Sequence, residues 1–201
     1  MNVDNEVIKA LYAGAWGDSR VRNFSPESGR ERQQAMSALV SNAGNNASAF
    51  IQVMTAWLGS DETAALDALD AVVLRRVKSV EILDYLWSLD QATDVIWSAH
   101  NLVDGFIDAV LGEDYAVCQW LFDKMEHLFS RSTWAWLYED DFFEYQACAD
   151  ELREKYQMDD IEIDPGTDFR ELFQRFVRVV QRATCEKCKG SPYEPLNIKG
   201  L

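Results

Sequence analysis

The sequence predicts an all-α protein, either an antiparallel helical bundle or a short helical-hairpin repeat array, with an amphipathic C-terminal helix and an irregular tail. The 138 residues between Pro26 and Pro165 contain no proline, the residue that most strongly interrupts a helix. Apolar residues recur there at helical spacing, and the junctions are very short. A hydrophobic content of 48% and an aromatic content of 12% exclude a generally disordered chain.

Capping residues mark where the predicted helices begin. Ser25 followed by Pro26 is a favourable start, because the serine caps an orphan N–H and proline fits the first turn. Gly44 and Gly59 are predicted stops, and Glu62 places a carboxylate in the first turn of a helix. The resulting helices are 2–15, 25–42 and 47–58, with further starts at Ser60, at Ser79, at Asp90 or Thr93, and at the junction after Gly112.

The clearest amphipathic helix begins at Phe169. Its apolar residues follow the spacing +3, +4, +7, +8 and +11 and are Phe169, Leu172, Phe173, Phe176, Val177 and Val180. Its opposite face carries Arg170, Arg175, Arg178 and Arg182. We therefore divide the chain into an acidic helical domain (1–157), a linker (158–166) and a C-terminal helix with its tail (167–201), which we expect to pack on the main domain.

Two stretches show similar patterning at an offset of 35 residues. Apolar and aromatic types recur in order in 81–87 and 116–122, each preceded by a shorter apolar segment predicted to be helical, 71–77 and 106–111. The run Lys78-Ser-Val-Glu-Ile-Leu-Asp-Tyr-Leu resembles the second helix of an ankyrin-type repeat, and the resemblance covers about residues 65–128. It implies an interaction scaffold that binds other proteins. The alternative is a bundle that happens to contain two amphipathic helices of similar length.

The net charge of the chain favours some classes of binding partner and disfavours others. The chain carries 34 acidic and 19 basic residues, a net charge of −15. The segment 79–165 holds 21 acidic and four basic residues, whereas 166–201 holds four acidic and seven basic. This field disfavours direct binding to nucleic acid or anionic membranes and favours a basic partner, including one that itself holds nucleic acid. Acidity that serves only solubility is the alternative.

The N-terminus has no basic region followed by an apolar core, and no apolar run approaches the ~18 residues that span a bilayer. Together with the sparse cysteines, this predicts a cytoplasmic protein with reduced thiols.

The segment 130–145 is the predicted partner-binding surface. It combines two Trp, two Tyr and two Phe with four carboxylates, so aromatic anchors and acidic steering groups stand together. The alternative is that Trp134, Leu137 and Phe143 belong to the core. The predicted partner-binding residues are Trp134, Trp136, Tyr138, Glu139, Asp140, Asp141, Glu144, Asp159 and Asp160.

Little in the sequence indicates catalysis. Cys185 and Cys188 form a Cys-x-x-Cys pair, half of a structural zinc site, but no second such pair or histidine pair completes it. His100 and His127 stand alone in helical surroundings, and no phosphate-binding or nucleophile motif occurs. We expect a protein that is not an enzyme and has no cofactor, with unremarkable thiols as the alternative to zinc.

Two functions follow from these patterns. The first is an inhibitor or antagonist that occupies the nucleic-acid-binding surface of a basic partner, by analogy with phage-type anti-defence and immunity proteins. The second is a helical-repeat adaptor that binds a protein through an aromatic groove. The arginine face of the helix that begins at Phe169 also makes a homodimer plausible, in which this face covers the acidic middle segment, 79–165, of a second copy.

Overall fold

The computed structural model describes residues 47–60, 62–69, 72–89, 95–140, 142–157 and 167–185. Every regular element in these ranges is helical, which confirms the all-α class. The helices are α3 (Ala47–Ser60), α4 (Glu62–Leu69), η1 (a 3₁₀ turn, Leu74–Arg76), α5 (Val80–Ser88), α6 (Ala99–Leu111), α7 (Tyr115–Leu128), α8 (Arg131–Asp140), α9 (Phe142–Tyr156) and α10 (Phe169–Thr184). The predictions for 2–15, 25–42, Asp90, Thr93, the linker 158–166 and the tail lie outside the described residues.

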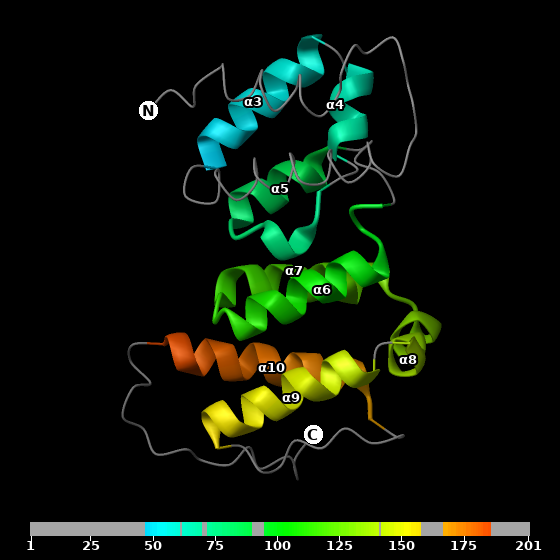
Figure 1. Cartoon of the computed structure of the whole chain (residues 1–201), viewed down its shortest axis with the longest axis vertical. Helices are drawn as coiled ribbons and strands as arrows, with labels where there is room; N and C mark the ends of the chain where they lie inside the picture. Colours follow the sequence, from blue (N-terminus) through cyan, green and yellow to red (C-terminus); the bar gives the residue numbers. More distant parts are fainter. Residues whose placement is uncertain are drawn as a thin grey trace.

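The helices stack along the long axis of the molecule (Figure 1). α3 packs against α4 and α5, and α5 packs against α7. α6 pairs with α7, covers η1 and contacts α9, while α10 packs against α6, α7 and α8. One hydrophobic core follows these contacts from Phe50 on α3 to Val180 on α10. A bundle and an array of helix pairs both allow such stacking, so the choice between them stays a prediction.

The C-terminal helix forms as its spacing predicts. All six predicted apolar residues of α10 are buried, because the helical period places them on the side that meets α6, α7 and α8. Asp168 caps the helix by accepting hydrogen bonds from the N–H groups of Arg170 and Glu171. Among the described residues, no helix is both long and apolar enough to cross a membrane.

The segment before α5 is not the short α-helix that its apolar pattern predicted. It forms the single 3₁₀ turn η1, and Val73 and Val77 on either side of that turn are extended. Two causes act together. β-Branched valines favour extended backbone, and the amide of Asn101 takes over backbone hydrogen bonds that a helix would otherwise make. Its Oδ1 accepts from the Leu74 N–H (2.9 Å) and its Nδ2 donates to the Val72 carbonyl (3.2 Å).

The remaining helix boundaries differ from prediction by small amounts or by a change of cap. Gly59 lies inside α3 and does not end it, whereas Gly112 does end α6. The segment 106–111 is only the second half of α6, which begins seven residues earlier. Ser98 caps the start of this helix, because its side chain accepts a hydrogen bond from the Asn101 N–H. Asp114 caps α7 in the same way through the Val117 N–H.

The burial of α5 recurs in α7 at the predicted offset. Both members are buried at three pairs of positions 35 residues apart: Ile82 and Val117, Leu83 and Cys118, and Leu86 and Leu121. Tyr85 and its counterpart Trp120 are both half-buried. The preceding elements are unlike, however, since η1 is one turn and α6 has 13 residues. The resemblance to ankyrin-type repeats therefore stays a prediction.

Candidate binding surface

Three tryptophans from three separate segments meet at the surface of the stack. Trp87 lies near the end of α5, Trp97 in the turn before α6, and Trp120 in the middle of α7. The ring centroids are 5.1 Å apart for Trp87 and Trp97, 5.8 Å for Trp97 and Trp120, and 6.2 Å for Trp87 and Trp120. All three side chains are half-buried, so each packs on the others and still presents part of its indole to solvent. We call these three residues the tryptophan cluster.

The backbone positions each ring. Trp87 and Trp120 stand on α5 and α7, which pack against one another. Trp97 depends on the turn of residues 95–97, and Asn101 holds that turn by donating from Nδ2 to the Ile96 carbonyl at 2.9 Å. The same amide also binds the segment at η1, so one side chain ties the turn to the rest of the fold.

A lysine lies over the cluster. Lys124 Nζ is 4.1 Å from the ring centroid of Trp87 and 4.8 Å from that of Trp120. Both distances are within the ~6 Å over which an aromatic face attracts a cation. Lys124 stands one turn after Trp120 on α7, which brings both side chains to the same face of the helix.

Polar and apolar groups border the cluster. The Nε1–H of Trp120 donates to Oδ1 of Asp84 at 2.7 Å, and the exposed His127 ring lies edge-on to Trp87 with centroids 6.4 Å apart. In the sequence, Val95 stands two residues before Trp97 and Leu128 directly follows His127, and these two are the large hydrophobic residues that are exposed in the described part of the chain, at 55% and 43%. A surface of this composition resembles the core of a protein interface more than an ordinary solvated face.

Trp134, one of the predicted partner-binding residues, belongs instead to the core. Trp134 is only 9% exposed and packs against Phe122, Phe129 and Phe173, at ring-centroid distances of 6.5, 5.0 and 5.9 Å. Its position on α8 points the indole at α10 and α7, so the alternative interpretation of this residue, as core, is the correct one. Leu137 is buried as well.

The structure does not test the other predicted contact residues. Trp136, Tyr138, Glu139, Asp140 and Glu144 lie on α8 and α9, but their side chains are outside what the structure describes. Asp141, Asp159 and Asp160 lie outside the described residues altogether. The acidic surface predicted there stays a prediction.

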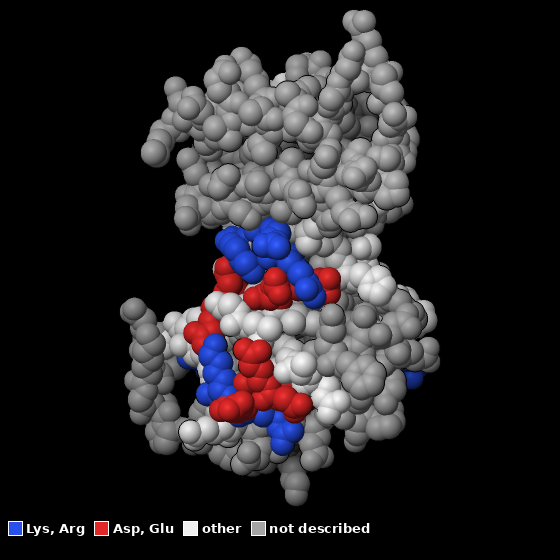
Figure 2. All heavy atoms as spheres, viewed as in Figure 1, with Lys and Arg blue, Asp and Glu red and all other residues white. Residues whose placement is uncertain are grey.

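Several carboxylates of the acidic middle are paired within the chain. Asp104 accepts from Arg75 at 3.0 Å, and Glu113 lies 2.7 Å from Lys155 Nζ. On the face in Figure 2, acidic and basic side chains accordingly lie side by side over the described part. The described part of this face is therefore not a continuous acidic surface.

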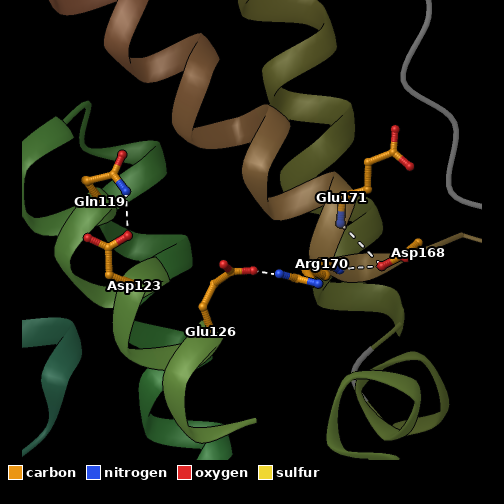
Figure 3. A network of polar contacts seen from close by, with 6 residues as sticks. All are labelled: Gln119, Asp123, Glu126, Asp168, Arg170 and Glu171. Atoms are coloured by element: carbon orange, nitrogen blue, oxygen red, sulfur yellow. Dashed lines mark hydrogen bonds and ion pairs between the residues drawn. The ribbon is translucent and has the colours of Figure 1, made fainter. Parts of the chain in front are cut away.

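One arginine of α10 pairs with a carboxylate of α7 in the same chain. Arg170, at the start of α10, donates from Nε to Glu126 on α7, and this contact raises the pKa of Arg170 (Figure 3). The neighbouring side chains of α7 form a separate polar pair, in which Gln119 donates to Asp123 at 2.7 Å. The ion pair of Arg170 and Glu126 joins α10 to α7 within one chain.

The cysteines divide by environment. Burial raises the pKa of Cys118 far above the ordinary thiol value and that of Cys148 to about 12, so both thiols stay protonated at neutral pH. Cys185 follows the end of α10 and is half-buried, while Cys188 lies outside the described residues. Within the described ranges, no three His, Cys, Asp or Glu side chains gather closely enough to hold a metal ion.

Comparison of the chain with protein-family models, with curated proteins and with solved structures finds no match.

The tryptophan cluster was not predicted from the sequence. The signals that point to it are short: Asp84 and Trp87 share a face of α5, and Trp120, Lys124 and His127 share a face of α7. Neither spacing reveals that the two faces meet, or that Trp97 joins them. That meeting depends on how α5, α6 and α7 pack.

Proposed function

We propose that this protein binds another protein and that the tryptophan cluster anchors the partner. The observation that supports this proposal is that three indoles from separate segments converge and stay half-buried at the surface. Indole rings bury a large area and lose little conformational freedom on binding. Tryptophan is also among the residues that contribute most to affinity in protein interfaces.

The charge of the chain supports a basic partner. The net charge is −15, and the helices that carry Trp87 and Trp120 also carry the exposed carboxylates of Asp84 and Asp123. Neither carboxylate forms an ion pair within the described ranges. Carboxylates beside an aromatic anchor accelerate the approach of a basic surface and disfavour an acidic one. We expect this binding to take place in the cytoplasm, without direct contact to nucleic acid or membrane.

Two biological roles fit such binding, and neither requires a catalytic residue. As an adaptor, the stacked helices would present the aromatic surface and hold the partner without blocking it. As an inhibitor or antagonist, the chain would cover a partner's nucleic-acid-binding surface, and the acidic run at Glu139, Asp140 and Asp141 would contribute to that contact. The half-buried tryptophans favour the first role, and the excess of 34 acidic over 19 basic residues favours the second.

The test compares matched variants of the full chain in capture from the native host lysate. Trp87→Leu and Trp97→Leu each replace an indole ring of the cluster by a smaller side chain that is still apolar. Tyr115→Leu is the control, because Tyr115 is also a half-buried aromatic residue of α7, and its hydroxyl hydrogen-bonds to Gln119 (3.4 Å) and not to a residue of the cluster. Circular dichroism and thermal unfolding first confirm that each variant folds.

The pattern among variants decides the outcome. A protein that binds the wild type and Tyr115→Leu but is lost from both tryptophan variants supports the proposal. Equal capture by all four chains would rule out the cluster as the anchor. Capture that persists at high salt favours the adaptor. Capture that is lost at high salt and on replacing Glu139, Asp140 and Asp141 by amides favours the antagonist, because screening weakens exposed charge interactions.

A further inference from the structure

We infer that the corner between Trp87 and Trp120 is a binding site for a cationic side chain of the partner, and that Lys124 occupies this site until the partner displaces it. This inference rests on the proposed function and specifies the group that the surface recognises. It names an arginine or lysine of a basic protein as the occupant.

The geometry of the two rings supports a cation site. Their planes are inclined at 85°, so the indoles form two walls of a corner, and Lys124 Nζ lies 4.1 and 4.8 Å from the two centroids. Trp97 packs against both walls and fixes them. An ammonium group in contact with two indole faces is the arrangement by which aromatic sites recognise cations.

The electrostatic surroundings strengthen the corner. The Nε1–H of Trp120 donates to the Asp84 carboxylate at 2.7 Å, and a charged acceptor polarises the indole so that its face becomes more negative. Within the described ranges, Lys124 makes no ion pair with a carboxylate, and its ammonium group lies over the two indole rings. The site already selects a positive charge in the isolated chain.

Lys124 is held in a way that permits exchange. Its side chain is half-buried and flexible, and its ammonium group is strongly hydrated, so it loses little on returning to water. A guanidinium group is planar, more weakly hydrated and stacks on aromatic rings, so an arginine is the better occupant. The acidic field of the chain raises the local concentration of such groups.

The experiment titrates the full-length chain with a short arginine peptide, acetyl-Gly-Arg-Gly-amide. The indole N–H signals of the tryptophans are followed by NMR. The same peptide with citrulline is the probe control, because citrulline keeps the shape of arginine without its charge. Lys124→Met removes the resident ammonium and keeps the apolar stem. Lys78→Met is the matched control, since it removes an equal charge at an exposed position before α5.

We expect the arginine peptide, and not the citrulline peptide, to shift the signals of the cluster. Lys124→Met should bind the arginine peptide about fivefold more tightly than Lys78→Met, because the competing cation is gone. Trp87→Leu should abolish the response. An equal response to both peptides, or equal affinity of the two lysine variants, would overturn the inference.

This inference and the proposed function fail in different ways. If the arginine peptide gives no response while Trp87→Leu still loses the captured protein, the cluster anchors a partner by apolar contact alone and the cation site is wrong. If Trp87→Leu retains the captured protein, the proposed function is wrong whatever the peptide does.

Discussion

At the scale of single residues, Glu113 holds the end of α9 against the corner between α6 and α7. One carboxylate oxygen accepts from Tyr156 Oη and lies close to Lys155 Nζ, both at 2.7 Å. The hydrogen bonds from Lys155 and Tyr156 lower the pKa of Glu113. The residue also has a positive φ of 56°, which a side chain other than glycine rarely adopts. Its contacts therefore help to hold an unfavourable turn.

The lowered pKa predicts how Glu113→Gln depends on pH. A folded pKa below the unfolded value stabilises the fold fully above the ordinary carboxyl pKa, and this contribution is lost as the pH falls through the lowered value. We expect the variant to lose stability at pH 7 by no more than about 1 kcal/mol, because the pair is partly exposed. Chemical unfolding from pH 7 to pH 3 should show the two chains converging at low pH. A gap that stayed constant with pH would contradict this prediction.

Helical spacing alone does not tell a core tryptophan from a tryptophan of the surface cluster. Trp134 and Trp120 look equivalent in the sequence, since each is a helical tryptophan near charged residues. Packing separates them: Trp134 faces Phe173 of α10 in the core, and Trp120 faces Trp97 at the surface. Which side of a helix meets the core depends on partners far along the chain, and spacing on one helix cannot supply that information.

At the scale of elements, the close approach of η1 to α6 depends on a glycine. A Cβ added at Gly105 would lie 2.8 Å from the Cβ of Leu74 and 3.2 Å from its backbone carbon. We expect Gly105→Ala to destabilise the fold by about 1–3 kcal/mol, because η1 would have to move. Gly59→Ala in α3 is the matched control, since a Cβ added at Gly59 has no neighbouring atom within 4 Å. It should be neutral or stabilising by up to about 1 kcal/mol.

Urea unfolding of both glycine variants measures the contrast. A loss of stability in Gly105→Ala alone supports the tight contact between η1 and α6. Equal behaviour of the two variants would show that η1 can shift without cost.

The elements also differ in how well the sequence predicts them. α10 was predicted correctly because its apolar spacing, its cap at Asp168 and its packing partners all favour the same helix. The stretch around Val72 and Val73 was predicted wrongly because its apolar residues suit a buried helix and a buried extended segment alike. The choice was made by Asn101, 27 residues beyond Leu74, whose amide binds the backbone there.

At the scale of the whole molecule, the question is whether the stack unfolds as one unit. α10 packs against α6, α7 and α8, whereas α3 packs against α4 and α5. Among the described elements, α5 packs against both α3 and α7 and so joins the two ends. In a stack in which each layer contacts its neighbours, a local loss of stability fades with distance. In a bundle with one cooperative core, it reaches every helix.

Phe173→Ala distinguishes these two forms of behaviour. Phe173 is fully buried and stacks on Phe106 of α6 with ring centroids 4.6 Å apart. Its truncation should lower the free energy of opening in α6, α7 and α10 by about 3–5 kcal/mol. We expect a clearly smaller loss at Phe50 in α3, because α3 packs against α4 and α5 and the loss must pass through α5 to reach it. Native-state hydrogen exchange, resolved by peptide, measures both. The same loss in α3 as in α10 would instead identify a single cooperative bundle and argue against a repeat array.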